Sequence, residues 1–170
     1  MWRILRQITR TGIVTEPAPP AGDALRDEAG RIGRELLDIL GRALAIRVVD
    51  AGSCNGCELE INALANPYYN LEGLGIRLVA SPRHADLLLV TGPVSRHMVE
   101  ALRRTADAMP EPRLVVAVGD CGACGGIFGT SYASCGAVAS VIPVDAAVSG
   151  CPPPPIEILR TILDVVRRRR

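Results

Sequence analysis

The stretch that decides the fold is Leu114–Val118, LVVAV, followed at once by residues 119–126, GDCGACGG. Five consecutive apolar residues are typical of a strand buried on both faces, because a half-exposed strand alternates apolar and polar residues. Two similar apolar runs, Ala45–Asp50 and Asp86–Val90, lie earlier in the chain. We therefore predict a parallel sheet that is covered by helices, with cysteines directly after its most apolar strand.

Segments with helical periodicity separate these runs. We predict helices from Asp23, as the N-cap, to about Leu44, then over Cys57–Ala65, from a Ser95 cap to about Ala108, and from Pro155 onward. Further strands are expected over Ile76–Ala80 and Val138–Val144. The alternation predicts a doubly wound α/β domain of flavodoxin-like type, with helices on both faces of a parallel sheet.

The length of 170 residues corresponds to one domain. We place that domain at residues 23–170 and treat residues 1–22 as an N-terminal arm with a Pro- and Ala-rich linker. The arm carries apolar residues between arginines. It is suited to a membrane surface, to a partner's groove or to a site on its own domain, and the sequence leaves these three open.

Composition excludes several function classes. Aromatic residues make up only 3% of the chain, too few for a platform that stacks single-stranded nucleic acid. A net charge of +1 argues against a polyanion-binding domain. No signal peptide or membrane-spanning apolar run is visible, so we expect a cytoplasmic chain, in which cysteine pairs bind metal or do chemistry more often than they form disulfides.

The cysteines follow the predicted strands. Cys54 and Cys57 come after the first strand, Cys121 and Cys124 after LVVAV, and Cys151 after the last. The carboxyl ends of parallel strands lie along one edge of the sheet, which is where such folds bind ligands. Glycines flank each group and let the backbone approach sulfur closely. The sequence therefore predicts a thiolate metal site at this edge.

Three kinds of site fit these cysteines. Two C-x2-C pairs suggest structural zinc, although the pairs are much farther apart than in a zinc ribbon. The Cys151-Pro152 pair and the strand-end placement favour a [4Fe–4S] cluster, because proline follows the last cysteine in bacterial ferredoxin motifs. A disulfide or thiol redox centre is the third alternative.

Three segments carry a family resemblance: residues 50–70 (DAGSCNGCELEINALANPYYN), 116–129 (VAVGDCGACGGIFG) and 142–159 (IPVDAAVSGCPPPPIEIL). Over about residues 45–165 the chain resembles the small subunit of membrane-bound, complex-I-related [NiFe] hydrogenases of the formate hydrogenlyase type. The homologous subunit of NADH:quinone oxidoreductase, which carries the cluster nearest quinone, is similar over the same stretch. That complex I homologue has two adjacent cysteines where this chain has C-x2-C, which favours the hydrogenase branch.

The resemblance implies one [4Fe–4S] cluster whose ligands are Cys54, Cys57, Cys121 and Cys151. It implies an electron-transfer subunit with no complete active site, held peripherally at the cytoplasmic face of the cell membrane by its complex. The expected partners are a hydrogenase-type large subunit with a nickel–iron site and further iron–sulfur and membrane subunits, without nucleic acid. The alternatives are a quinone-reducing subunit of complex I type and a zinc-stapled interaction domain.

Some residues near the motifs have weaker assignments. Cys124 and Cys135 have no predicted chemistry. Glu60 matches a glutamate of the complex I homologue and is a candidate proton relay; its other interpretation is a first-turn glutamate that interacts with the helix dipole. Residues 91–93 are expected to shape the cluster pocket. We expect Tyr68-Tyr69 and Phe128 to contact the large subunit.

Overall fold

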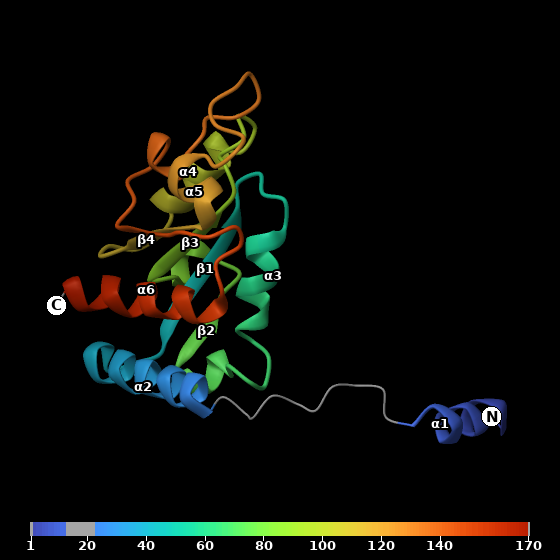
Figure 1. Ribbon diagram of the computed structural model, residues 1–170. Helices are drawn as coiled ribbons and strands as arrows, with labels where there is room; N and C mark the ends of the chain where they lie inside the picture. The colour runs from blue at the N-terminus through green and yellow to red at the C-terminus, as the bar shows by residue number, and fades with distance from the viewer. Residues whose placement is uncertain (1, 13–22, 170) are drawn as a thin grey trace.

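The computed structural model describes residues 2–12 and 23–169. Its centre is a five-stranded parallel sheet in the order β2-β1-β3-β4-β5 (Figure 1). This 2-1-3-4-5 order is the flavodoxin-like one, so the predicted fold class is confirmed. The strands are β1 (Leu44–Asp50), β2 (Ile76–Leu78), β3 (Leu87–Thr91), β4 (Leu114–Val118) and β5 (Ala146–Val148).

Helices cover both faces of this sheet (Figure 1). The α-helices are α1 (Trp2–Thr11), α2 (Asp23–Leu40), α3 (Gly56–Ala63), α4 (Val99–Asp107), α5 (Gly119–Cys124) and α6 (Pro155–Arg168). Three short 3-10 segments are η1 (Leu71–Leu74), η2 (Pro82–His84) and η3 (Val138–Ser140).

The central strands are buried on both sides, as the apolar runs predict. In β3, Leu87 and Leu89 belong to the core beneath α2, α3 and α6, whereas Leu88 and Val90 belong to the core beneath α4 and η3. All five β3 residues are buried. Side chains of a strand point to opposite faces in turn, so an uninterrupted apolar run supplies two cores at once.

The strand expected over Val138–Val144 is wrong. Residues 138–140 form η3 instead, with Val138 fully buried. Pro143 has no N–H with which to continue a ladder, and β5 begins only at Ala146, which pairs with Val116 of β4. Cys151 still follows the last strand, because β5 ends at Val148.

Two helix boundaries also differ from the expectation. The helix predicted to reach Leu44 ends at Leu40, because Gly41 adopts a left-handed φ of 65° and its N–H bonds to the Leu37 carbonyl at 2.8 Å. Ser95 is not a helix cap, since α4 begins at Val99. Its N–H instead donates to the Ala51 carbonyl at 2.7 Å.

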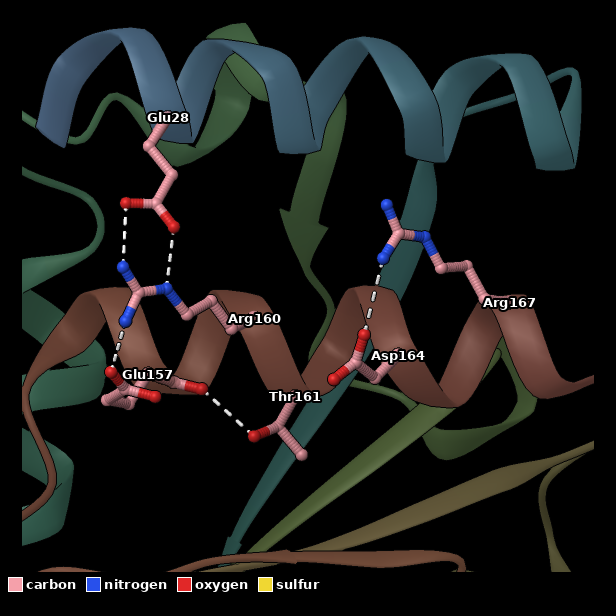
Figure 2. A network of polar contacts seen from close by, with 6 residues as sticks. All are labelled: Glu28, Glu157, Arg160, Thr161, Asp164 and Arg167. Carbon is pink, nitrogen blue, oxygen red and sulfur yellow. Dashed lines mark hydrogen bonds and ion pairs between the residues drawn. The ribbon is translucent and has the colours of Figure 1, made fainter. Parts of the chain in front are cut away.

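Ion pairs join α2 to α6 on the outer surface. Arg160 donates from Nε and Nη2 to the two carboxylate oxygens of Glu28, at 2.6 and 2.8 Å, and also contacts Glu157 (Figure 2). Arg167 pairs in the same two-pronged way with Glu35, at 2.5 and 2.7 Å. These hydrogen bonds hold the pKa values of both glutamates below their usual range.

Candidate iron–sulfur site

The loop after β1 carries the first two predicted ligands. Oδ1 of Asp50 accepts hydrogen bonds from the N–H groups of Gly52 and Ser53, each at 2.8 Å, and so turns the chain sharply at the strand end. This turn leaves Cys54 exposed in the loop and places Cys57 in the first turn of α3, where it is buried.

The loop after β4 packs directly against this pair, and its glycines make the approach possible. At Gly119, with φ of 82°, a Cβ atom would lie 2.5 Å from Sγ of Cys57. At Gly126, with φ of 54°, it would lie 2.8 Å from Sγ of Cys121. Real Cβ atoms do not come that close, and a positive φ favours glycine. These two glycines therefore form a cradle around the thiols.

Asp120 links the second loop to the third. Its Oδ1 accepts from the Gly150 N–H at 2.7 Å, and its own N–H donates to the Gly150 carbonyl at 2.9 Å. Asp120 precedes Cys121 and Gly150 precedes Cys151. The paired hydrogen bonds thus hold the segments of these two cysteines side by side.

The thiol of Cys57 interacts electrostatically with the thiols of the other three predicted ligands. Burial is the main cause that raises the pKa of Cys57 to about 11, followed by the neighbouring Glu58 carboxylate. The thiols of Cys54, Cys121 and Cys151 add to this rise. Burial likewise raises the pKa of Cys121, and Cys151 and Cys54 contribute. Within residues 2–12 and 23–169, no three His, Cys, Asp or Glu side chains are grouped to hold one metal ion.

The two remaining cysteines, Cys124 and Cys135, differ from each other in exposure and in contacts. Sγ of Cys124 is exposed and donates to the Asp120 carbonyl at 3.2 Å, one turn back in α5. Cys135 is half-buried and packs against the core beneath α4.

Thr91 and Gly92, at the end of β3, also lie at this edge. Gly92 has a φ of 74°, and a Cβ there would lie 2.5 Å from the Ser53 nitrogen, so this glycine lets the β3 end touch the loop of Cys54. The Thr91 hydroxyl is fully buried and donates to Oε1 of Glu58.

Glu58 lies at the site, whereas sequence reasoning singled out its neighbour Glu60. Its Oε2 is buried and has no hydrogen-bond partner among the described residues. Glu60, the residue singled out from sequence, is half-buried on α3 near Tyr69. The position of Glu58 in the sequence could have indicated this, because Glu58 directly follows Cys57 in the first turn of α3. The role assigned to Glu60 stays a prediction.

A cluster of exposed apolar side chains follows α5. Ile127 and Tyr132 are each 94% exposed and Phe128 is 53% exposed, next to the loop of Cys121.

Tyr68 and Tyr69 stack edge to face, with ring centroids 5.0 Å apart. The exposure of Phe128 and Tyr68 is compatible with the predicted contact to another subunit.

Residues 54–165 match the family described as NADH ubiquinone oxidoreductase, 20 Kd subunit. This chain belongs to that family. The predicted resemblance is therefore confirmed, and so is the expectation that the chain is a subunit of an oxidoreductase.

Relatives in this family include subunits of hydrogenases. A probable membrane-bound hydrogenase subunit, mbhJ, of Pyrococcus furiosus is 42% identical over 76% of this chain and 77% of its own length. Formate hydrogenlyase subunit 7 of Escherichia coli is 43% identical over 73% of this chain, which spans about half (49%) of that protein.

A solved relative supports the fold of this family member. A chain of the membrane-bound sulfane sulfur reductase, an archaeal respiratory membrane complex, superposes with a TM-score of 0.65 at 30% identity and covers 79% of this chain and 77% of its own. In the described part of the present chain, no helix is both long enough and apolar enough to cross a bilayer.

Proposed function

We propose that the chain is an electron-transfer subunit that carries one [4Fe–4S] cluster, held by Cys54, Cys57, Cys121 and Cys151. The observation that carries this proposal is the meeting of three strand-end loops, each with a predicted ligand, at one edge of the sheet. Bound there, the cluster would supply one-electron transfer.

The chain's own groups fit such a cluster. A cubane takes one thiolate on each iron, so its ligands surround it from several directions, and three separate loops provide this better than one zinc knuckle does. Gly119 and Gly126 leave space beside the sulfurs, while Asp50 and Asp120 hold the loops in place. Burial of Cys57 keeps water from the inner side of the site.

We further propose that the electron partner is a large subunit with a nickel–iron site. The hydrogenase names of the relatives and the C-x2-C spacing of Cys54 and Cys57 support this. The exposed side chains of Ile127, Phe128 and Tyr132 would form part of the contact, because large apolar groups at a protein surface mark interaction sites. The same complex would hold the chain peripherally at the cytoplasmic face of the membrane.

Quinone reduction is the second candidate. The family description and the 46% identity to an NADH-quinone oxidoreductase subunit of Herpetosiphon aurantiacus favour it. Here the partner would hold no nickel, so the metal content of the neighbouring subunit distinguishes the two candidates.

Metal analysis of the chain, produced without oxygen, tests the cluster. We expect about four irons and four acid-labile sulfides per chain, and an EPR signal in the reduced protein. Each of the variants Cys54→Ser, Cys57→Ser, Cys121→Ser and Cys151→Ser should lose iron, whereas Cys124→Ser and Cys135→Ser serve as controls that keep it. Zinc without sulfide would refute the proposal, and iron retained in Cys121→Ser but lost in Cys124→Ser would reassign one ligand.

The partner is tested on the complex isolated from its native membranes. Nickel together with hydrogen evolution from a reduced electron donor is expected for the hydrogenase assignment. A nickel-free complex that reduces quinone would instead establish the second candidate.

A further inference from the structure

The helix α1 exposes an apolar face for which the described residues provide no cover. None of its residues is buried. Trp2 is 83% exposed, and Ile4, Leu5 and Ile8 are 64%, 53% and 58% exposed. Figure 1 shows the helix outside the layers of the α/β domain. Four large apolar side chains in ten residues are unusual on a surface without a binding role.

The opposite face of α1 is positively charged. With 3.6 residues per turn, Ile4, Leu5 and Ile8 fall within an arc of about 100°. The residues Arg3, Arg6 and Arg10 fall within about 60° on the other side. The helix contains no acidic residue, and no carboxylate of the described chain pairs with these arginines.

The two threonine hydroxyls of α1 are already hydrogen-bonded inside the helix. The hydroxyl of Thr11 donates to the Gln7 carbonyl at 2.6 Å, and that of Thr9 donates to the Arg6 carbonyl at 3.1 Å. The threonine hydroxyls are therefore paired within the helix, and the features of α1 that remain open to a partner include its apolar face and its arginines.

We propose that α1 binds the surface of a membrane that contains anionic lipid. Its apolar face would lie at the boundary between headgroups and acyl chains, and its arginines would meet lipid phosphates. A lipid surface provides both environments along one helix, whereas a protein groove would cover the apolar face and leave the arginines in water. The proposal goes beyond the electron-transfer role, because it gives this chain a lipid contact of its own.

Tryptophan fluorescence of the full-length chain tests this directly, since Trp2 is the only tryptophan. We expect a blue shift of its emission with vesicles of phosphatidylcholine and phosphatidylglycerol, and quenching by lipids brominated on their acyl chains. The chain should bind vesicles of phosphatidylcholine alone more weakly, by a factor of about ten or more. Added salt should weaken its binding to the anionic vesicles.

Two sets of substitutions separate the faces. The double variant Leu5→Glu with Ile8→Glu should lose binding by about tenfold or more, and Arg3→Gln with Arg6→Gln and Arg10→Gln should abolish the preference for anionic lipid. Leu78→Glu, which changes an exposed leucine of β2 outside α1, is the control and should bind like the parent.

Equal binding by the Leu5→Glu, Ile8→Glu variant would overturn the proposal. So would a Trp2 blue shift that requires an added partner subunit and is absent with vesicles, because α1 would then occupy a protein groove. The cluster assignment is unaffected by either result, since metal content is measured separately.

Discussion

At the scale of single residues, the contact between Glu58 and Thr91 ties the first turn of α3 to the end of β3, beside the buried Cys57. The carboxylate is partly enclosed, and its Oε2 lacks a partner in the described part of the protein. A carboxylate in this position depends strongly on the one hydroxyl that it does contact, because an unpaired buried polar group is costly. The pair therefore positions the loop that presents Cys54 and Cys57.

The substitution Thr91→Val tests this dependence. It keeps the shape of the side chain but removes the donor to Glu58, so we expect the free energy of unfolding to fall by about 1–3 kcal/mol. Urea denaturation of the chain measures it. The control is Thr105→Val, whose hydroxyl bonds only to the Ala101 carbonyl of its own helix and which should change stability by less than about 0.5 kcal/mol. Equal losses in both variants would contradict a special role for Thr91.

At the scale of elements, α2 closely approaches the backbone of η1 at Gly33. A Cβ at Gly33 would lie 2.8 Å from Cα and 2.9 Å from the carbonyl oxygen of Leu74. Backbone atoms cannot give way as a side chain can. A Cβ at Gly30, one turn earlier, would meet only Nη1 of Arg34, at 3.6 Å. The packing of α2 against η1 therefore requires a glycine at position 33 but not at position 30.

The pair Gly33→Ala and Gly30→Ala tests this difference. We expect Gly33→Ala to destabilise the fold by about 1–3 kcal/mol through overpacking. We expect Gly30→Ala to stabilise it by about 0.5–1 kcal/mol, because alanine loses less conformational entropy in a helix. Thermal and urea unfolding report both changes. Stabilisation by both substitutions would show that α2 can move away from η1 without cost.

At the scale of the whole molecule, ion pairs between α2 and α6 connect segments that are distant in the sequence. Figure 2 shows Arg160 reaching from α6 to Glu28 of α2. The pKa values of Glu28 and Glu35 are lowered in the folded state by their arginine partners. A lowered folded pKa means that the contribution to stability is present above the unfolded pKa and is lost as the pH falls through the folded pKa.

We therefore expect the chain to lose stability as the pH is lowered below about 4.5, where unfolded glutamates begin to take up protons. Glu28→Gln combined with Glu35→Gln should make this loss shallower and slightly lower the stability at pH 7. Urea midpoints measured across the acid range give the comparison. Glu72→Gln, at an exposed carboxylate that joins no ion pair in the described segments, is the control. An unchanged acid profile in the double variant would contradict the role of these pairs.

The sequence by itself determined the fold class and the edge at which the cysteine loops gather. Uninterrupted apolar runs such as Leu114–Val118 require burial on both faces, and this local property led to the parallel sheet that the structure contains. The cysteines that follow these runs lie at one edge of the sheet, because the carboxyl ends of parallel strands share that edge. The prediction of a strand over 138–144 was wrong, because apolar composition alone does not distinguish a buried turn such as η3 from a strand. Pro143, which lies within this segment, cannot donate a hydrogen bond to a strand ladder.

Only the tertiary structure decided which side chains meet at that edge. Glu58 and Glu60 both follow Cys57 on α3, and local sequence does not say which of them faces the end of β3; the packing of α3 against the sheet selects Glu58. The link from Asp120 to Gly150 likewise depends on β4 and β5 being neighbours. Periodicity along a chain reports burial, whereas partners across the fold are set by strand order and helix rotation, which arise from the packing of the whole domain.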